Sequence, residues 1–206
     1  MHCSRRNTWL VFLLAAVGTG YAALGISGPP DARLQQLTSE TCGGCHGADG
    51  NSVAPEFPKL AGQQKVYLQR ELMDYKEGRR QSDIMVPLVA SLSEDDVARL
   101  SAYYAAQEPA PGTVSRPELL ELGKRIYLEG NTKSGVPSCD GCHEENGEGS
   151  KKFPRVAGQH AAYALDQMKQ YASGKRSNGV KVMRTIAERL TKEEAEAVAE
   201  YMASLK

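Results

Sequence analysis

The 206-residue sequence has little of the material from which small protein cores are normally built. Aromatic residues make up only 6% of the chain, and no alternating run of apolar and polar residues is long enough for a β-strand, which favours an all-α fold. Four of the five cysteines form two C-x-x-C pairs, so no disulfide framework remains and Cys3 has no assigned role. The formal net charge at pH 7 is zero, and no nucleic-acid partner is expected. The chain therefore needs another source of stability, and a large apolar cofactor can supply it.

The four paired cysteines belong to two copies of one motif, C-x-x-C-H. The copies read CGGCH at residues 42–46 and CDGCH at residues 139–143. This motif is typical of c-type haem attachment, in which two thiols bond the haem vinyl groups and the adjacent imidazole ligates the iron. The sequence thus predicts two covalently bound haem c groups attached through Cys42, Cys45, Cys139 and Cys142, with iron ligands His46 and His143.

Two other chemistries use paired cysteines: a thiol redox pair and a zinc site. Either would use the sulfur atoms without needing a histidine directly after the second cysteine. A zinc site assembled from both pairs would leave two histidines unexplained. Two copies of the full five-residue motif in a chain with an export-like N-terminus favour the dihaem interpretation.

The N-terminus has the composition of an export segment. Residues 1–8 contain two arginines and no acid, and residues 9–26 contain no charge at all. Residues 1–28 are therefore expected to be either a cleaved signal peptide or an N-terminal membrane anchor, since the uncharged run is also long enough to span a bilayer. Both alternatives predict a periplasmic protein, either soluble or anchored to the periplasmic face of the membrane.

The rest of the chain is one unit written twice. FPKLAGQ at residues 57–63 returns as FPRVAGQ at residues 153–159, offset by 96, and the C-x-x-C-H motifs are offset by 97. Other matched pairs keep nearly the same offset, among them Tyr67 with Tyr163 and Arg80 with Arg176. After the leader we expect three segments: a first domain at 29–108, a proline-rich linker at 109–115 and a second domain at 116–206.

Each unit reads as a series of helices. Residues 64–77 and 160–173 are predicted helices, and the glycine after each, Gly78 or Gly174, suits a left-handed C-terminus. In the first unit a shorter, less well marked helix is expected from about Asp31 into the first cysteine motif.

Capping boxes mark three helix starts in the sequence. The last helix of each unit is expected to open with one, formed by Ser93 with Asp96 and by Thr191 with Glu194. A third box is expected at the start of the second domain, formed by Ser115 with Glu118.

A low-spin electron carrier needs a second axial ligand on each iron, usually methionine or histidine. His160 aligns with Gln64, so it cannot belong to a duplicated site, and we interpret it as an ordinary helix-start residue. Among the methionines only Met85 and Met183 coincide in the two repeats, and both are expected in loops that reach over the haem. The remaining methionines are expected to be packing or surface residues: Met73, Met168 and Met202.

The repeated phenylalanine–proline pairs are the next candidates for the cofactor pocket. Pro58 and Pro154 are expected to form a rigid apolar wall near each proximal imidazole, where their backbone could orient the free ring N–H. A purely structural turn is the alternative interpretation.

These residues together resemble the cytochrome c4 family of dihaem class I cytochromes. The resemblance covers nearly everything from Ser39 to Lys206 and is most specific at residues 158–163, GQHAAY. It implies two tandem class I cytochrome c domains, each wrapped around one covalently attached haem with histidine and methionine on the iron, and haems that face one another across the domain interface. One departure is that the first-unit helix lacks the glycine that Gly123 supplies in the second.

The resemblance implies an electron carrier and not an enzyme. The expected partners are a membrane-bound respiratory donor complex and a terminal oxidase, since methionine ligation gives a high potential. Two alternatives stay open. One is a cytochrome subunit of a dehydrogenase complex, of the flavocytochrome sulfide dehydrogenase or alcohol dehydrogenase type. The other is a dihaem peroxidase, which would need one iron open.

The two halves of the chain also differ in charge. Residues 31–108 contain 8 basic and 12 acidic side chains, a net of −4, whereas residues 116–206 contain 15 and 13, a net of +2. An asymmetric field of this kind orients a charged partner before contact. We therefore expect donor and acceptor to dock at opposite ends of the molecule, the alternative being two ordinary solvated surfaces.

Overall fold

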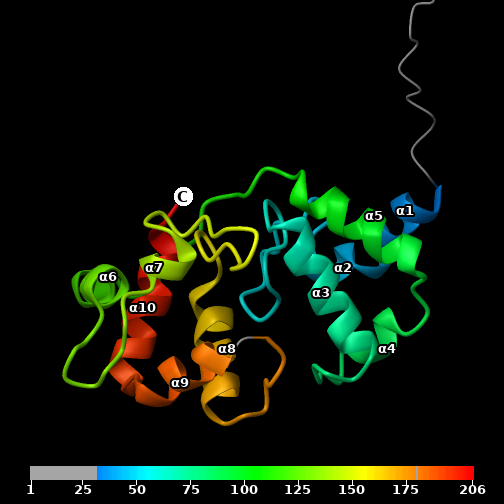
Figure 1. Cartoon of the computed structure of the whole chain (residues 1–206). Helices are drawn as coiled ribbons and strands as arrows, with labels where there is room; N and C mark the ends of the chain where they lie inside the picture. The colour runs from blue at the N-terminus through cyan, green and yellow to red at the C-terminus, as the bar shows by residue number, and fades with distance from the viewer. Residues whose placement is uncertain (1–31, 180) are drawn as a thin grey trace, which may run out of the picture.

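The computed structural model describes residues 32–179 and 181–206. These residues form two helical bundles that lie side by side, joined by an extended connection that runs over one end (Figure 1). No β-strand occurs in these two ranges, where an isolated bridge pairs Asn131 with Val136. The expected all-α fold with two tandem helical domains is confirmed.

The expected leader, residues 1–28, and its uncharged run at residues 9–26 lie outside the described residues. Asp31 lies outside them as well, so the first described helix is seen from Ala32 onward. Within the part of the chain that the structure describes, every helix is too short or too polar to cross a membrane.

The first domain is built on two longer helices, α3 (Lys65–Lys76) and α5 (Glu94–Ala105). Its first helix is interrupted, because α1 (Ala32–Gln36) continues as a π-helical turn, η1 (Leu37–Thr41). In that turn the Thr38 hydroxyl donates to the carbonyl oxygen of Leu34 (3.0 Å), a local bond that competes with the regular helix ladder. The remaining helices are short: α2 (Gly43–His46) and α4 (Met85–Val89).

The second domain repeats this order, with a longer first helix and a longer α9. The elements are a 3₁₀ turn, η2 (Pro117–Leu119), followed by α6 (Leu120–Glu129), α7 (Asp140–His143), α8 (Ala161–Ala172), α9 (Lys181–Arg189) and α10 (Lys192–Ser204). The backbone N–H of Cys139 donates to the Tyr127 carbonyl oxygen (2.7 Å), and that of Cys42 donates to the Leu37 carbonyl oxygen (2.8 Å). The first helix thus meets each cysteine motif in the same way, although the second domain has the longer connection.

Two of the three expected capping boxes are confirmed. Ser93 accepts from the Asp96 N–H at the start of α5, and Thr191 accepts from the Glu194 N–H at the start of α10, with the acid bonding back in each case. The predicted box at Ser115 is wrong, because its N–H donates instead to the Glu200 carboxylate of α10 (2.8 Å). The distant Glu200 therefore takes the place of the nearby Glu118 as the acceptor for the Ser115 N–H.

Glu118, the other half of that predicted box, pairs with Arg116 (3.0 Å). The glycine stops behave as predicted, because Gly78 and Gly174 both have positive φ, at 74° and 75°.

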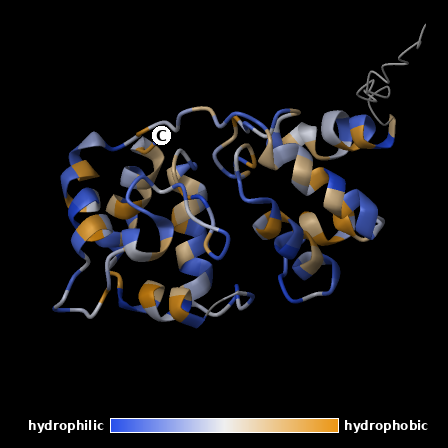
Figure 2. Cartoon of the chain, turned by 45° about the horizontal axis from the view of Figure 1, so that its top comes forward, coloured by the Kyte–Doolittle hydropathy of each residue, from blue (hydrophilic) through white to orange (hydrophobic). Residues whose placement is uncertain are grey.

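Each domain has its own apolar core, and Figure 2 shows apolar positions on the helices of both. The first core gathers residues from α3, α4 and α5, and the second gathers residues from α6, α8 and α10. The apolar faces expected for the last helices lie in these cores, with Val97, Leu100 and Tyr104 in the first and Val198 and Met202 in the second. Both cores are small, and helices of both domains also line a cavity that these cores do not fill.

The helices α6 and α10 cross at Gly123. A Cβ atom at this position would lie 2.1 Å from the carbonyl oxygen of Ala197, far inside a normal contact distance. The first domain has no glycine at the matching crossing. There α1 lies beside α5, and Arg33 forms an ion pair with Asp96 (3.4 Å). Close approach of the first and last helices is therefore a property of the second domain.

We expect Gly123→Ala to destabilise the second domain, because the added methyl group forces α10 away from α6. The free energy of unfolding should fall by roughly 1–3 kcal/mol, the usual effect of overpacking a core. Lys124→Ala, on the exposed side of the same helix, is the matched control and should change it by less than about 0.5 kcal/mol. Urea unfolding followed by circular dichroism measures both, and an unchanged midpoint in Gly123→Ala would contradict the close crossing.

Candidate cofactor-binding site

Each C-x-x-C-H motif forms one turn of helix. The His46 N–H donates to the Cys42 carbonyl oxygen (3.0 Å), and the His143 N–H donates to the Cys139 carbonyl oxygen (2.9 Å). Cysteines three residues apart in such a turn lie on the same face. Gly43 is required for this packing, because a Cβ there would lie 2.3 Å from the Thr38 carbonyl oxygen. The turn therefore presents two thiols and an imidazole together.

Both motif histidines are buried and held in the same way. The Nδ1 atom of His46 lies 2.9 Å from the Pro58 carbonyl oxygen, and that of His143 lies 2.9 Å from the Pro154 carbonyl oxygen. Burial lowers the pKa of both imidazoles, although these bonds oppose the effect. A neutral imidazole that donates from Nδ1 keeps Nε2 as a free ligand atom. The role expected for the two proline backbones is therefore seen in the hydrogen bonds.

One cavity of about 950 Å³ runs between the two domains and reaches both motifs. Ligand pockets generally measure about 300–1,000 Å³, so this space lies at the upper end of the range. The cavity lining includes all eight residues predicted from the sequence: Cys42, Cys45, His46, Met85, Cys139, Cys142, His143 and Met183. The geometry thus brings both sets of predicted residues to one continuous space.

The placement of the two predicted methionines in loops is wrong. Met85 is the first residue of α4, where its N–H donates to the Ser82 hydroxyl (3.1 Å), and Met183 lies in α9. Pro87 is compatible with the helix because it lies in the first turn of α4, where a proline costs no helix hydrogen bond. Short helices instead of loops fix both side chains toward the cavity.

The other methionines lie where they were expected. Met168 and Met202 are buried in the second core, and Met73 packs against the first.

The cavity fits a large, mostly apolar group that also accepts hydrogen bonds. Buried polar atoms among its lining residues that have no hydrogen-bond partner within the described chain include the Ser101 hydroxyl and the Arg155 Nε atom. Buried polar atoms of this kind normally have partners, and the acidic edge of a haem is one that would satisfy them. Leucines and tyrosines from both domains supply the apolar walls.

The alternative cysteine chemistries fit less well. Burial raises the pKa of the Cys139 thiol to about 12, whereas a reactive redox cysteine needs a lowered value. In residues 32–179 and 181–206, no three His, Cys, Asp or Glu side chains lie close enough together to hold a metal ion, which a joint zinc site would need.

The two copies of the repeated F-P-[KR]-[LV]-A-G-Q segment meet at the domain interface. The Gln63 amide accepts from the Arg155 N–H and donates to the Arg155 carbonyl oxygen, both at 2.9 Å. Gln159 makes the same pair of bonds with Lys59, both at 3.0 Å. Sequence reasoning found the repeat but missed this role, although the recurrence of the glutamine at a fixed offset was the available signal.

His160 also belongs to this interface, so its interpretation as an ordinary helix-start residue is incomplete. It precedes α8 as expected, but its Nε2 atom lies 2.9 Å from the Ser52 carbonyl oxygen of the first domain. The aligned Gln64 reaches the other way, donating to the Glu148 carbonyl oxygen (2.6 Å). The two aligned positions therefore tie each domain to the matching loop of the other.

Comparison with known proteins agrees with this geometry. The cytochrome c family model matches residues 32–105 and 120–206. Cytochrome c4 from Pseudomonas aeruginosa is 40% identical over 97% of this chain and 99% of its own length. The crystal structure of reduced recombinant cytochrome c4 from Pseudomonas stutzeri superposes with a TM-score of 0.79 at 36% identity, covering 85% of this chain and 99% of the other. The chain belongs to the cytochrome c4 family.

As a member of this family, the protein is a dihaem electron carrier and not an enzyme, with one haem c attached covalently in each domain. A further relative is described as a thiosulfate dehydrogenase electron acceptor from Stutzerimonas stutzeri. It is 36% identical over 80% of this chain and 78% of its own length.

Replacing both Cys139 and Cys142 by alanine should leave a protein with one attached haem. The second domain should then lose helix content and unfold at a lower temperature, because a domain of this size has too small a core without its cofactor. The matched control replaces Cys42 and Cys45 and should produce the same loss in the first domain. Intact mass and circular dichroism measure both effects. Unchanged helix content and thermal stability would contradict the claim that the haem forms the core of the domain.

Proposed function

We propose that this protein carries electrons in the periplasm from a membrane-bound respiratory donor to a terminal oxidase. The observation that carries the proposal is the single cavity shared by both domains, since it allows an electron to enter at one haem and leave from the other. The proposed attachment residues are Cys42, Cys45, Cys139 and Cys142, and the proposed iron ligand pairs are His46 with Met85 and His143 with Met183.

The support for the ligand pairs is their matched environment. In each domain the imidazole is held at Nδ1 by a proline carbonyl, and a methionine from a short helix lines the same cavity. A methionine thioether opposite histidine raises the potential of a haem iron, which suits delivery to an oxidase. When bound, the two haems supply one-electron chemistry. The chain's own contribution is to orient the imidazoles, exclude water and leave no open site for a substrate.

The proposed domain division follows the same helices. We place the leader at residues 1–28, the first domain at 29–108, the linker at 109–115 and the second domain at 116–206. The linker is tied to the first domain, because Lys59 donates to the carbonyl oxygens of Ala110 (3.1 Å) and Pro111 (2.7 Å). The composition of residues 1–28 supports export as a signal peptide or anchor.

A second candidate function is to accept electrons directly from a dehydrogenase. The observation in its favour is the relative described as a thiosulfate dehydrogenase electron acceptor. This function predicts that the protein co-purifies with, or is reduced by, a dehydrogenase. A dihaem peroxidase is disfavoured, because both domains place a methionine at the cavity and a peroxidase needs an iron it can open.

The ligand proposal predicts a sulfur-to-iron charge-transfer band near the red edge of the visible spectrum in the oxidised protein. Met85→Ala and Met183→Ala should each remove about half of this band, because each removes the sulfur from one of two irons. Met73→Ala, which alters packing in the first domain, is the control and should keep the full band. Retention of the whole band in both single variants would show that the ligands lie elsewhere.

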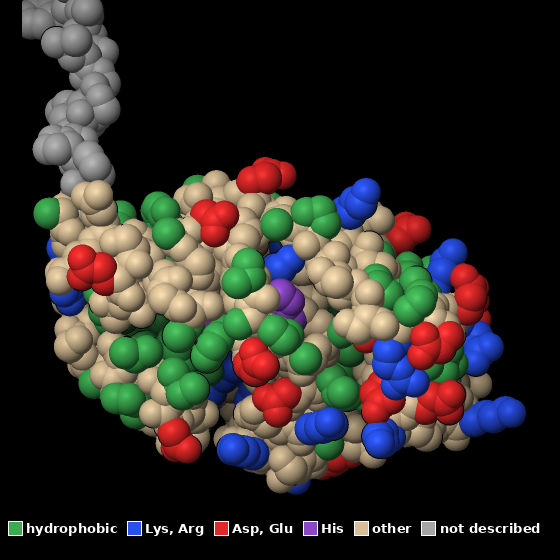
Figure 3. All heavy atoms as spheres, turned by 180° about the vertical axis from the view of Figure 1, so that it is seen from behind, with side chains coloured by type: hydrophobic (Ala, Val, Ile, Leu, Met, Phe, Trp, Pro, Cys, Tyr) green, Lys and Arg blue, Asp and Glu red, His purple; other side chains and the backbone are tan. Residues whose placement is uncertain are grey.

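The proposed docking at opposite ends rests on the charges around the cavity. Exposed acids of the first domain, Glu56 and Asp83, line its edge, as do exposed lysines of the second domain, Lys152 and Lys175. Figure 3 shows mainly hydrophobic and uncharged side chains on one face of the first domain, and many charges of both signs on the second. The two domains therefore offer different surfaces to partners (Figure 3).

Charge reversal tests this arrangement. Reversing Glu56 and Asp83 together should slow one half-reaction with the physiological partners, and reversing Lys152 and Lys175 should slow the other, because each set steers a different partner. Both effects should weaken as ionic strength rises. Lys192→Glu, outside the cavity lining, is the control. If both sets slow the same half-reaction equally, a single shared docking face is the better account.

A further inference from the structure

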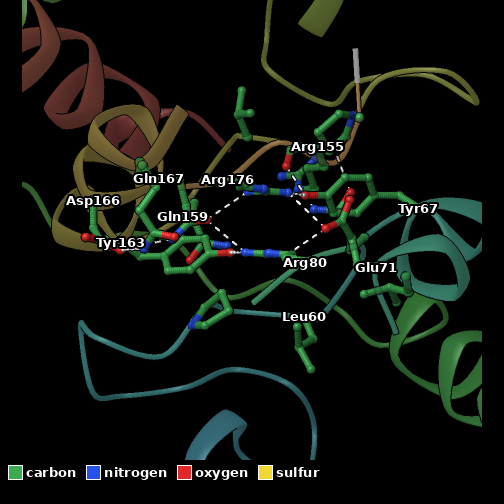
Figure 4. A pocket seen from close by; sticks show the side chains of 18 of the residues that line it. Leu60, Tyr67, Glu71, Arg80, Arg155, Gln159, Tyr163, Asp166, Gln167 and Arg176 are labelled. Atoms are coloured by element: carbon green, nitrogen blue, oxygen red, sulfur yellow. Dashed lines mark hydrogen bonds and ion pairs between the residues drawn. The ribbon is translucent and has the colours of Figure 1, made fainter. Parts of the chain in front are cut away.

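Four buried side chains form a closed ring between the two domains (Figure 4). Arg80 of the first domain donates to the Glu71 carboxylate (2.7 Å) and to the Gln167 amide oxygen (2.8 Å). Arg176 of the second domain donates to the same two oxygen atoms, at 3.0 and 2.8 Å. Each arginine thus bridges a residue of its own domain and one of the other.

The ring follows the repeat, since its members align in pairs. Arg80 matches Arg176 and Glu71 matches Gln167, each at an offset of 96. The symmetry extends outward, because Arg80 reaches the hydroxyl of Tyr163 (3.1 Å) and Arg176 reaches that of the matching Tyr67 (3.0 Å). Within the ring the acceptor pair breaks the symmetry, with a carboxylate in the first domain and a neutral amide in the second.

The broken symmetry continues one turn along the helix. Asp74, on α3 with Glu71, accepts from Asn178 of the second domain (2.7 Å) and pairs with Arg79 (2.6 Å). Its counterpart in the repeat is Gln170, which carries no charge. The buried carboxylates at this interface therefore all come from the first domain. Asp166 is an acid of the second domain that bonds Gln167, but it is exposed and its field is screened by water and salt.

The ring is shielded from water. All four members are buried, with exposed fractions of 6% for Glu71, 6% for Arg80, 8% for Gln167 and 4% for Arg176. Burial opposes the charge of Arg176, yet its partners, Tyr67 and Glu71 among them, hold its pKa well above the usual value. Buried charges act on their surroundings more strongly and over longer distances than exposed ones.

The ring also borders both iron sites. All four of its residues line the cavity that contains the predicted haem ligands of the two domains. Glu71 lies on α3, whose residues Leu68, Leu72 and Tyr75 line the side of the cavity formed by the first domain. A negative charge near a haem favours the oxidised iron, which carries one more positive charge than the reduced iron.

We propose that Glu71 is a positioning residue that biases the internal electron transfer toward the second haem. Its carboxylate stabilises the oxidised first iron, while the two guanidiniums that bind it hold the domains together. With both haems bound, the half-reduced protein would hold one electron, which would leave the first iron ferric and the second ferrous, with no bond made or broken. The inference rests on the proposed placement of one iron site in each domain.

The test moves the carboxylate across the ring. The reference is Asp166→Asn, because Asp166 would repel a carboxylate placed at position 167. Two variants are made in that background: Glu71→Gln, which removes the charge, and Glu71→Gln with Gln167→Glu, which transfers it to the second domain. Nuclear magnetic resonance of the half-reduced protein gives the electron occupancy of each haem. Thermal unfolding and the charge-transfer band are measured on the same samples.

In the reference protein the electron should rest mainly on the second haem. Glu71→Gln should reduce the ratio of second-haem to first-haem occupancy by roughly three- to tenfold, and the transferred carboxylate should reduce it further, toward the first haem. The transfer variant keeps two guanidiniums, one carboxylate and one amide, so it should unfold near the temperature of the reference. Glu94→Gln, an exposed acid of the same domain, is the control for the loss of one charge.

An unchanged occupancy ratio in Glu71→Gln or in the transfer variant would overturn the inference and leave the ring a purely structural clamp. The charge-transfer band separates this failure from failure of the proposed ligands. A full band with an unchanged ratio rejects only the role of Glu71, whereas a band absent from the reference rejects the methionine ligands. If Glu71→Gln does not fold, the transfer variant decides, because it retains the composition of the ring.

Discussion

Each domain encloses a space that its own side chains do not fill, and the rest of the structure depends on that space. The helices of each domain meet in a small core on one side and line the shared cavity on the other. An empty apolar volume of this size would be strongly destabilising, because its walls would lose their contacts. Covalent attachment of a haem solves this permanently, since the group that fills the cavity cannot dissociate. Folding and function are therefore tied to the same cysteines.

The shared cavity also explains why the interface is so heavily hydrogen-bonded. Two domains that each open toward the other expose backbone and polar groups at the rim of the cavity, and these groups need partners once water is excluded. The exchanged bonds of Gln63 and Gln159 supply them in pairs, because one repeated residue meets the backbone of the other copy. Because the segment is duplicated, one repeated glutamine forms the same pair of hydrogen bonds twice across the interface.

Much of this architecture could be predicted from the sequence, because its strongest signals are local or periodic. The C-x-x-C-H turns, the capping boxes at Ser93 and Thr191 and the repeat register all depend on residues close together in the chain. The register also placed Met85 and Met183 at the cavity, although it could not show that both lie in helices. Local sequence signals gave a wrong prediction where a residue distant in the sequence provides the hydrogen-bond partner. Ser115 bonds Glu200 instead of Glu118, and no short-range rule could foresee that competition.

The interface residues were the hardest to interpret, because their partners lie about a hundred positions away in the sequence. His160 was set aside because it has no histidine counterpart, yet it occupies the same structural role as Gln64. Two aligned residues of different type, such as His160 and Gln64, can therefore play the same structural role. The Arg–Glu–Arg–Gln ring shows the same difference between equivalent position and identical residue type, because Glu71 and Gln167 occupy matching positions and differ in charge. A duplicated scaffold treats its two halves alike, whereas electron transfer between two partners has a direction. That direction has to come from positions where the fold is symmetric and the charge is not, and Glu71 opposite Gln167 is such a position inside the shared cavity.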